Sequence, residues 1–347
     1  MKTANFLKMF ALFLAIGITS CTTEPTDQNE GGNNNGNGEL ILSADESRVY
    51  ENTIVTFTVT DAAGANVTSN ATISVDGNDI GGNIFNMVGI GTKTVTAVVG
   101  SDNANSLTVE VIQPSFTTKA LIEDYTGAWC GWCPRISQGI IDVHNATNGE
   151  NVIAVAVHNG DSMQFPLEAQ MRSQFGVTGF PTGILNRDAE WQAVTGSTMN
   201  VSQPMALLNG TRPLGLAINS TMSGNSVSAT IKVGFDFDTS DMKLVAMLLE
   251  NGKVAPQTNY TNNWGGVSTI SNFVHNDILR AAFTDIFGDA IPADQQVGGG
   301  EYSVTLSANI PSGTNTADMD IVAFVVDGSG KVVNVQHAAV GATVDFD

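Results

Sequence analysis

Two cysteines three residues apart are the residues of this sequence best suited to chemistry. Cys130 and Cys133 lie in the stretch GAWCGWCPRI, and the only other cysteine is Cys21. The thiolate is the nucleophilic form of cysteine, so a reactive pair needs a local feature that lowers the pKa of a thiol. A helix that begins at the pair would supply this feature, because its unpaired amides and its dipole stabilise a negative sulfur.

The spacing of the pair fits thiol–disulfide exchange. Cys130, in the loop before the helix, could attack a substrate disulfide, and Cys133, in the first turn, could then resolve the mixed disulfide. The same pair could instead form an inert structural disulfide. A metal site is disfavoured, because zinc prefers four ligands and the four histidines follow no paired pattern. We therefore expect no metal and no cofactor.

The residues around the cysteines predict a strand–helix–strand unit. The segments KALIEDYTG (119–127) and NVIAVAVHN (151–159) have the composition of strands, and apolar residues recur at helical spacing between them. Such a unit forms a right-handed crossover between parallel strands. Further helices are expected in PLEAQMRSQFG (166–176), which ends at a glycine suited to a C-cap, and in NVSQPMALLNG (200–210).

The flanking regions predict β-structure. Residues 40–113 alternate apolar and polar positions between Asp, Gly and Asn clusters, which is typical of an immunoglobulin-like β-sandwich. We expect this module to be a spacer, with specific adhesion as the alternative. Residues 213–347 predict a second β-sandwich with one helical insert, NDILRAAFTDIFG (276–288), anchored by His275.

The start of the chain predicts export. Lys2 and Lys8 precede the apolar run MFALFLAIGI (9–18), which has about the length of a signal-peptide core and is too short to span a bilayer. The stretch ends in ITSC, which resembles a bacterial lipobox and implies that Cys21 receives the lipid; an ordinary signal peptide is the alternative. The following residues, including EGGNNNGNG, have almost no apolar content and predict a flexible tether.

Charge limits the possible partners. The chain has 14 basic and 34 acidic residues, a formal net charge of −20, which repels phosphate backbones and argues against nucleic acid as a partner. Hydrophobic residues make up 42% and charged residues 14% of the chain, which is a globular balance. No Ser-His-Asp elbow, phosphate-binding loop or calcium loop appears in the sequence.

The motif DYTGAWCGWC resembles the thioredoxin active site. By this resemblance Asp124 is the buried acid before the first cysteine, although the adjacent Glu123 could face inward instead. A buried carboxylate there could relay the proton of Cys133, and the alternative is a satisfied polar group at the end of a strand. Trp129 is the aromatic residue immediately before Cys130. The dipeptide between the cysteines is Gly-Trp rather than Gly-Pro, which leaves the direction of electron transfer open.

The motif GFPT resembles the cis-proline loop of the same family. The resemblance implies a cis peptide bond before Pro181, which would shape a substrate groove over the disulfide. Phe180 and Thr182 would line this groove. Trp129 and Trp132 flank the cysteines and are expected to form a docking patch for the substrate, with ordinary packing as the alternative.

A wider resemblance covers most of the sequence after the tether. The segments EDYTG, CP, VHNGD, FPTGILNR and FVHNDILRAAFTDIFG, in this order, resemble the outer-membrane-protein-28-related lipoproteins of Bacteroidota. The resemblance implies a thioredoxin-like α/β domain joined to a β-rich C-terminal domain.

The sequence as a whole predicts an exported protein that is lipid-anchored to the outer membrane, on its periplasmic face or at the cell surface. We expect it to exchange disulfides with extracytoplasmic client proteins; the alternative is a surface binding or scaffold lipoprotein whose disulfide is only structural. The expected parts are a signal peptide (1–20), a lipidated cysteine with a tether (21–39), an immunoglobulin-like sandwich (40–113), a central α/β thioredoxin-like domain (114–212) and a C-terminal β-rich domain (213–347).

Overall fold

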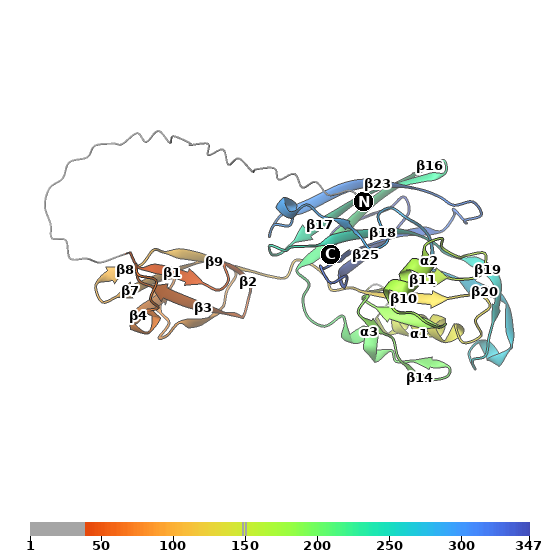
Figure 1. The fold of residues 1–347 in the computed structure, drawn as a ribbon, viewed down its shortest axis with the longest axis horizontal. Coiled ribbons are helices and arrows are strands. Elements are labelled where there is room, and N and C mark those ends of the chain that lie inside the picture. Colours follow the sequence, from red (N-terminus) through yellow and green to blue (C-terminus); the bar gives the residue numbers. More distant parts are fainter. Residues whose placement is uncertain (1–38, 148, 150) are drawn as a thin grey trace, which may run out of the picture.

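The computed structural model describes residues 39–147, 149 and 151–347. The expected signal peptide, the lipidation site Cys21 and all but the last residue of the tether lie outside these residues. Figure 1 shows a small β module, formed by the first strands, beside a larger body that contains the remainder. Within the described residues, no helix has both the length and the apolar character needed to span a membrane.

The N-terminal module consists of two sheets around one core. One sheet has the strand order β1-β3-β6 and the other β2-β9-β7-β4-β5, with β8 paired to β7. Strand β3 shows the reason for this packing, since every second residue from Val55 to Val59 is buried and its neighbours are not. The strands are β1 (Ile41–Ala44), β2 (Arg48–Tyr50), β3 (Thr53–Thr60), β4 (Ala71–Val75), β5 (Asn78–Asp79), β6 (Ile84–Met87), β7 (Gly91–Val99), β8 (Asp102–Asn103) and β9 (Leu107–Ile112).

The expected strand–helix–strand unit is present in the larger body. Strand β10 (Ala120–Thr126) pairs in parallel with β11 (Val152–His158), and helix α1 (Pro134–Thr147) connects them. All seven residues of each strand are buried, as their apolar composition requires. Strand β12 (Thr182–Leu185) pairs antiparallel on the other side of β10, and helix α2 (Glu168–Gln174) precedes it.

The expected central α/β thioredoxin-like domain is wrong, because this unit is part of a larger β structure. The free edge of β11 pairs with β21 (Ile278–Ala282), and the sheet continues through β18 (Lys243–Glu250), β24 (Met319–Val326) and β25 (Val332–Ala339). The result is one nine-stranded mixed sheet. The three α-helices of the described chain have only 14, 7 and 5 residues, so strands dominate the fold.

A shared core explains why the strand–helix–strand unit and the C-terminal strands do not form separate domains. Leu121 and Val155 of β10 and β11 belong to the same buried apolar cluster as Val245, Leu279 and Phe324 of the C-terminal strands. Burial of apolar surface is the dominant favourable term in folding, so one continuous core favours one folding unit. The α/β unit is therefore one end of a large sheet.

A second layer covers the C-terminal half of this sheet. It is a four-stranded sheet in the order β23-β17-β16-β26, made of β16 (Leu214–Ser223), β17 (Ser226–Phe235), β23 (Glu301–Asn309) and β26 (Thr343–Val344). Its Leu216 and Ile231 pack with Leu248 and Ile321 of the large sheet. The C-terminal strands thus form a sandwich, one layer of which also contains β10 to β12.

The expected helical insert at 276–288 is also wrong. Its first half is strand β21, where Ile278 and Leu279 are completely buried. Strand β21 pairs with β11 on one side and with β18 on the other. Local sequence periodicity suggested a helix, but two flanking strand edges decide the conformation of this segment.

A hairpin between β18 and β21 completes the arrangement around the cysteines. Its strands are β19 (Lys253–Thr258) and β20 (Thr269–His275), and they pair only with each other. Figure 1 shows the hairpin at the edge of the body, beside the end that contains α2 and β11. The remaining elements are β13 (Ala189–Glu190), β14 (Ala193–Thr195), β15 (Thr198–Met199), α3 (Ser202–Ala206), β22 (Asp289–Ala290) and the 3₁₀ turns Thr68–Asn70, Trp264–Gly266 and Ala293–Gln295.

Candidate functional site

The two cysteines form a disulfide directly before helix α1. The S–S distance is 2.07 Å, and the amides of Ile136 and Ser137 donate hydrogen bonds to the carbonyl oxygen of Cys133. Only 2% of Cys130 and 1% of Cys133 is exposed. The pair therefore lies at a helix start, as expected, but neither residue is accessible in this conformation.

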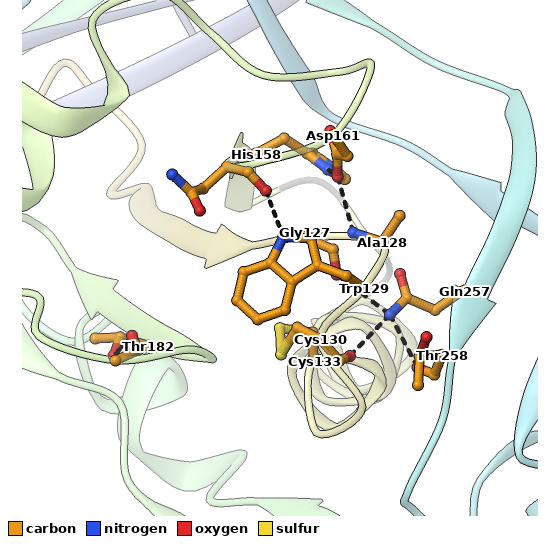
Figure 2. The surroundings of a disulfide bond; sticks show 12 residues. Gly127, Ala128, Trp129, Cys130, Cys133, His158, Asp161, Thr182, Gln257 and Thr258 are labelled. Atoms are coloured by element: carbon orange, nitrogen blue, oxygen red, sulfur yellow. Dashed lines mark hydrogen bonds and ion pairs between the residues drawn. A yellow bond between two sulfur atoms is a disulfide. The ribbon is translucent and has the colours of Figure 1, made fainter.

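The β19–β20 hairpin covers the disulfide loop. The side-chain Nε2 of Gln257 donates to the carbonyl oxygens of Cys130 at 2.9 Å and Gly127 at 3.3 Å, and Figure 2 shows these contacts. The amide of Thr258 donates to the Ala128 carbonyl at 2.9 Å. These bonds satisfy backbone groups of the loop with partners more than 100 residues away in the sequence.

Tyr260 of the hairpin also contacts the disulfide loop. Its amide donates to the Gly131 carbonyl at 2.6 Å, and its ring lies so close to Gly131 that any side chain there would collide with it. Only glycine fits at position 131 while the hairpin is docked. We call residues 257–260 the cap of the disulfide loop.

Exposed aromatic side chains surround the capped disulfide. Trp129 is 49%, Trp132 43% and Tyr260 62% exposed. The ring of Trp129 lies 5.4 Å from that of Phe180, and the ring of Trp132 lies 6.1 Å from that of Tyr260, both edge to face. We call these four residues the aromatic rim. Figure 2 shows Trp129 directly beside the disulfide.

The loop that carries Trp129 is held by polar groups that follow β11. The indole N–H of Trp129 donates to the Asn159 carbonyl at 2.7 Å. One carboxylate oxygen of Asp161 accepts from the Ala128 amide and contacts Nδ1 of His158, both at 2.8 Å. Burial opposes ionisation of Asp161, but these hydrogen bonds prevail and lower its pKa.

The GFPT motif contributes Phe180 to the aromatic rim. The peptide bond between Phe180 and Pro181 is cis, as the sequence predicted. Thr182 is the first residue of β12, and its hydroxyl donates to the Gly179 carbonyl at 2.9 Å. In Figure 2 Thr182 lies to the side of the disulfide, whereas the ring of Phe180 packs against that of Trp129.

Asp124 is buried, as predicted, with 3% of the residue exposed. Its Oδ1 atom has no hydrogen-bond partner, and burial, together with the charge of Asp277, raises the pKa of Asp124 to about 8. The carboxyl lines a cavity that it shares with His158, His275 and Asp277. No group of three or more His, Cys, Asp or Glu side chains in the described part of the chain could hold a metal ion.

Sequence reasoning did not identify the cap. Gln257 and Tyr260 lie about 130 residues from the cysteines, and no local motif marks them. Their contact with the loop exists only because β18 and β21 enter the same sheet as β11 and project the intervening hairpin towards α1.

The sequence of the chain matches the model of a known protein family. The model of the Omp28 outer membrane protein family matches residues 168–344, more than half of the chain. The chain belongs to the Omp28 family. This assignment confirms the relationship that the sequence motifs suggested, and it supports a location in the cell envelope. It does not show a thioredoxin-like domain, and the matched residues begin after both cysteines.

Solved structures add a likeness of fold. This Omp28 protein is similar to HBP35 of Porphyromonas gingivalis, with a TM-score of 0.53 and 21% identity over 66% of this chain and 77% of that one. At this identity the likeness concerns the fold alone. The Yersinia pseudotuberculosis adhesin InvE aligns over 89% of this chain and 61% of its own, with 11% identity and a TM-score of only 0.17, too low to indicate a common fold. No curated protein matches the sequence.

Proposed function

We propose that this Omp28 protein is a surface binding protein, lipid-anchored at Cys21 to the outer membrane, whose Cys130–Cys133 disulfide is structural. The observation that carries the proposal is the burial of both cysteines, 2% and 1% exposed, beneath a cap that hydrogen-bonds to their loop. Thiol–disulfide exchange needs direct attack on a sulfur, so a capped disulfide is a poor substrate for it.

The aromatic rim is the proposed binding surface. Exposed Trp and Tyr side chains are the residues that most often dominate the binding energy of protein interfaces. Three of the four rim residues are more than 40% exposed, and the two tryptophans lie on a loop fixed by the disulfide, by Asp161 and by the cap. A rigid surface loses little entropy on binding, which favours affinity. The proposed partner is an extracytoplasmic protein.

The remaining parts of the chain fit this role. In the sequence, the N-terminal β module follows the proposed anchor and precedes the body, and it would act as a spacer. It contacts the body at one end, where the Tyr50 hydroxyl donates to Asp236 at 2.8 Å and the Tyr50 ring packs on Phe237. The proposed tether and spacer would hold the rim away from the lipid surface.

The competing function is disulfide exchange, with Cys130 as nucleophile, Cys133 as resolving thiol, Asp124 as proton relay and Pro181 shaping the groove. The position of the pair at the start of α1 favours it, because a helix start stabilises a thiolate. For this function the cap would have to leave the loop during each turnover.

One experiment separates the two functions. The reduction rate of the disulfide by dithiothreitol is measured at pH 7 on the folded chain and on the chain unfolded in urea, and Cys133→Ser is used to trap mixed disulfides in envelope extracts. We expect reduction to be far slower in the folded chain and no client to be trapped. Equal reduction rates in both states, together with clients trapped by Cys133→Ser but not by Cys130→Ser, would establish exchange instead.

A further inference from the structure

A cavity of about 330 Å³ lies between the sheet, helix α1 and the β19–β20 hairpin. Its walls come from β10, β11, α1 and the β19–β20 hairpin with the turn between its strands. Trp264 and Phe273 supply an aromatic wall, with ring centres 5.2 Å apart. Ligand pockets are usually about 300–1,000 Å³ and mostly apolar with a few polar groups, so this cavity suits a small molecule.

Two buried polar atoms on the cavity wall have no partner. They are Oδ1 of Asp124 and Nε2 of His275, in residues that are only 3% and 4% exposed. Nearly all buried polar groups in folded proteins are hydrogen-bonded, and an unsatisfied one costs about 1–3 kcal/mol. Two such atoms in residues that line one cavity therefore offer hydrogen-bonding positions to a molecule bound there.

The chemistry of the wall indicates which kind of molecule would bind there. Two carboxyl groups, of Asp124 and Asp277, line the cavity, but no lysine or arginine does. His275 supplies no positive charge, because burial and the nearby His158 lower its pKa to about 4. A neutral imidazole has one acceptor nitrogen, so the unpartnered Nε2 of His275 can accept a hydrogen bond when the proton is on Nδ1. A cation that donates hydrogen bonds would complement both groups.

We infer that the cavity is a binding site for a small primary amine, held as its ammonium ion by the carboxylate of Asp124, with Nε2 of His275 as a further acceptor and Trp264 and Phe273 against its apolar part. A metal ion is not the occupant proposed, because the described side chains include no suitable ligand group. An aromatic wall suits this ligand, because aromatic side chains offer a large apolar surface to the apolar part of the amine.

Binding of an ammonium ion at Asp124 should be coupled to the release of a proton. With a pKa of about 8, Asp124 carries a proton for most of the time at pH 7, and the ammonium ion pairs only with the carboxylate. Binding of the ammonium ion therefore releases the carboxyl proton to the buffer. The titratable groups that face Asp124 across the cavity or close to it are His144, His158, Asp161, His275 and Asp277.

The test is calorimetric titration of the full chain with benzylamine and, separately, with benzyl alcohol, which has nearly the same shape but no charge. We expect saturable 1:1 binding of benzylamine and at least about tenfold weaker binding of the alcohol, since a charge-assisted hydrogen bond is worth about 1.5–3 kcal/mol. Titration in two buffers of different ionisation enthalpy should show release of a proton.

Matched variants assign the effect to the cavity. Asp124→Asn should weaken benzylamine binding by about tenfold or more and abolish proton release, whereas Asp294→Asn, an exposed position far from the cavity, should change neither. His275→Gln is a second variant in case Asp124→Asn does not fold, and it should weaken binding as well. The proposal is overturned if benzylamine does not saturate by roughly 10 mM, well above a 1 mM dissociation constant, or if the alcohol binds equally well. A crystal structure with benzylamine that shows only water at Oδ1 of Asp124 would also overturn it.

Discussion

Two adjacent acidic residues of β10 face opposite sides of the large sheet, and their surroundings differ completely. Glu123 is fully buried, and its Oε1 accepts from Nε and Nη2 of Arg187 at 3.1 and 2.8 Å. The Arg187 guanidinium also donates to the Ile286 carbonyl and stacks on Phe324. Asp124 has no cationic neighbour on its cavity wall and leaves Oδ1 without a hydrogen bond.

This difference distinguishes a structural acid from a functional one. Both residues are acidic, buried and sequence neighbours, so composition and burial do not separate them. A buried charge that is paired and fully hydrogen-bonded stabilises one conformation, whereas an unpaired one destabilises the fold and persists where it serves another role. The side of the sheet that carries Asp124 also carries the capped disulfide, so the candidate sites lie together on one face.

The strongest test of the comparison removes the partner of Glu123. Arg187→Met should reduce the free energy of unfolding by about 3–5 kcal/mol, because it leaves a buried carboxylate unpaired. Urea denaturation measures this loss. Lys232→Met is the matched control, since its ion pair with Glu301 is half exposed and its removal should change stability little. Equal losses in the two variants would show that the buried Glu123–Arg187 pair contributes no more to the free energy of unfolding than an exposed ion pair.

The cap can be displaced with a single methyl group. Gly131→Ala should collide with the Tyr260 ring, lower the free energy of unfolding by about 1–3 kcal/mol and accelerate reduction of the disulfide by dithiothreitol. Gly179→Ala is the control, because a side chain there meets no atom within 4 Å and φ is not positive. Unchanged reduction of Gly131→Ala would mean that the cap does not protect the sulfurs.

Asp124 should make stability depend on pH. Its native pKa of about 8 exceeds the ordinary value of 3.8, so between these values the native state binds a proton that the unfolded state does not. The free energy of unfolding should therefore fall as the pH rises from about 4 to 8, by up to about 1.4 kcal/mol per pH unit for one proton. Asp277, with a pKa raised by burial to about 7, should add to the fall.

The measurement is urea denaturation at a series of pH values. Asp124→Asn should flatten the profile and make the chain more stable than the unsubstituted chain at pH 8, whereas Asp294→Asn should leave the profile unchanged. A profile that Asp124→Asn does not alter would show that this carboxyl ionises as it does in water.

The smallest effect on stability is expected at the aromatic rim. Trp132→Ala should reduce the free energy of unfolding by less than about 1 kcal/mol, because the side chain is 43% exposed, yet it should weaken partner binding by about tenfold or more if the rim is the binding surface. Met222→Ala, at an exposed apolar position on β16, is the control. The readout is the amount of envelope protein that is cross-linked to each variant. Equal amounts for both variants would exclude the rim as the binding surface.

Local patterns predicted much of the disulfide region. The strand–helix–strand unit around the cysteines and helix α2 were expected from neighbouring residues, and the cis bond before Pro181 from the resemblance of GFPT to a family motif. The disulfide joins residues only three apart, so its feasibility was also visible in the sequence. The prediction for segment 276–288 was wrong because pairing with the two neighbouring strands β11 and β18 outweighs its local helical periodicity.

The sequence by itself determined the short-range features: a cysteine pair at a helix start, alternating strands and family motifs. The tertiary structure alone decided that β21 joins β11 to the C-terminal strands, that residues 257–260 cap the disulfide, and that Arg187 pairs with Glu123 while Asp124 stays unpaired. The reason is physical: local patterns reflect the conformation of neighbouring residues, whereas pairing across more than 60 residues depends on which strand edges and cores meet when the chain collapses.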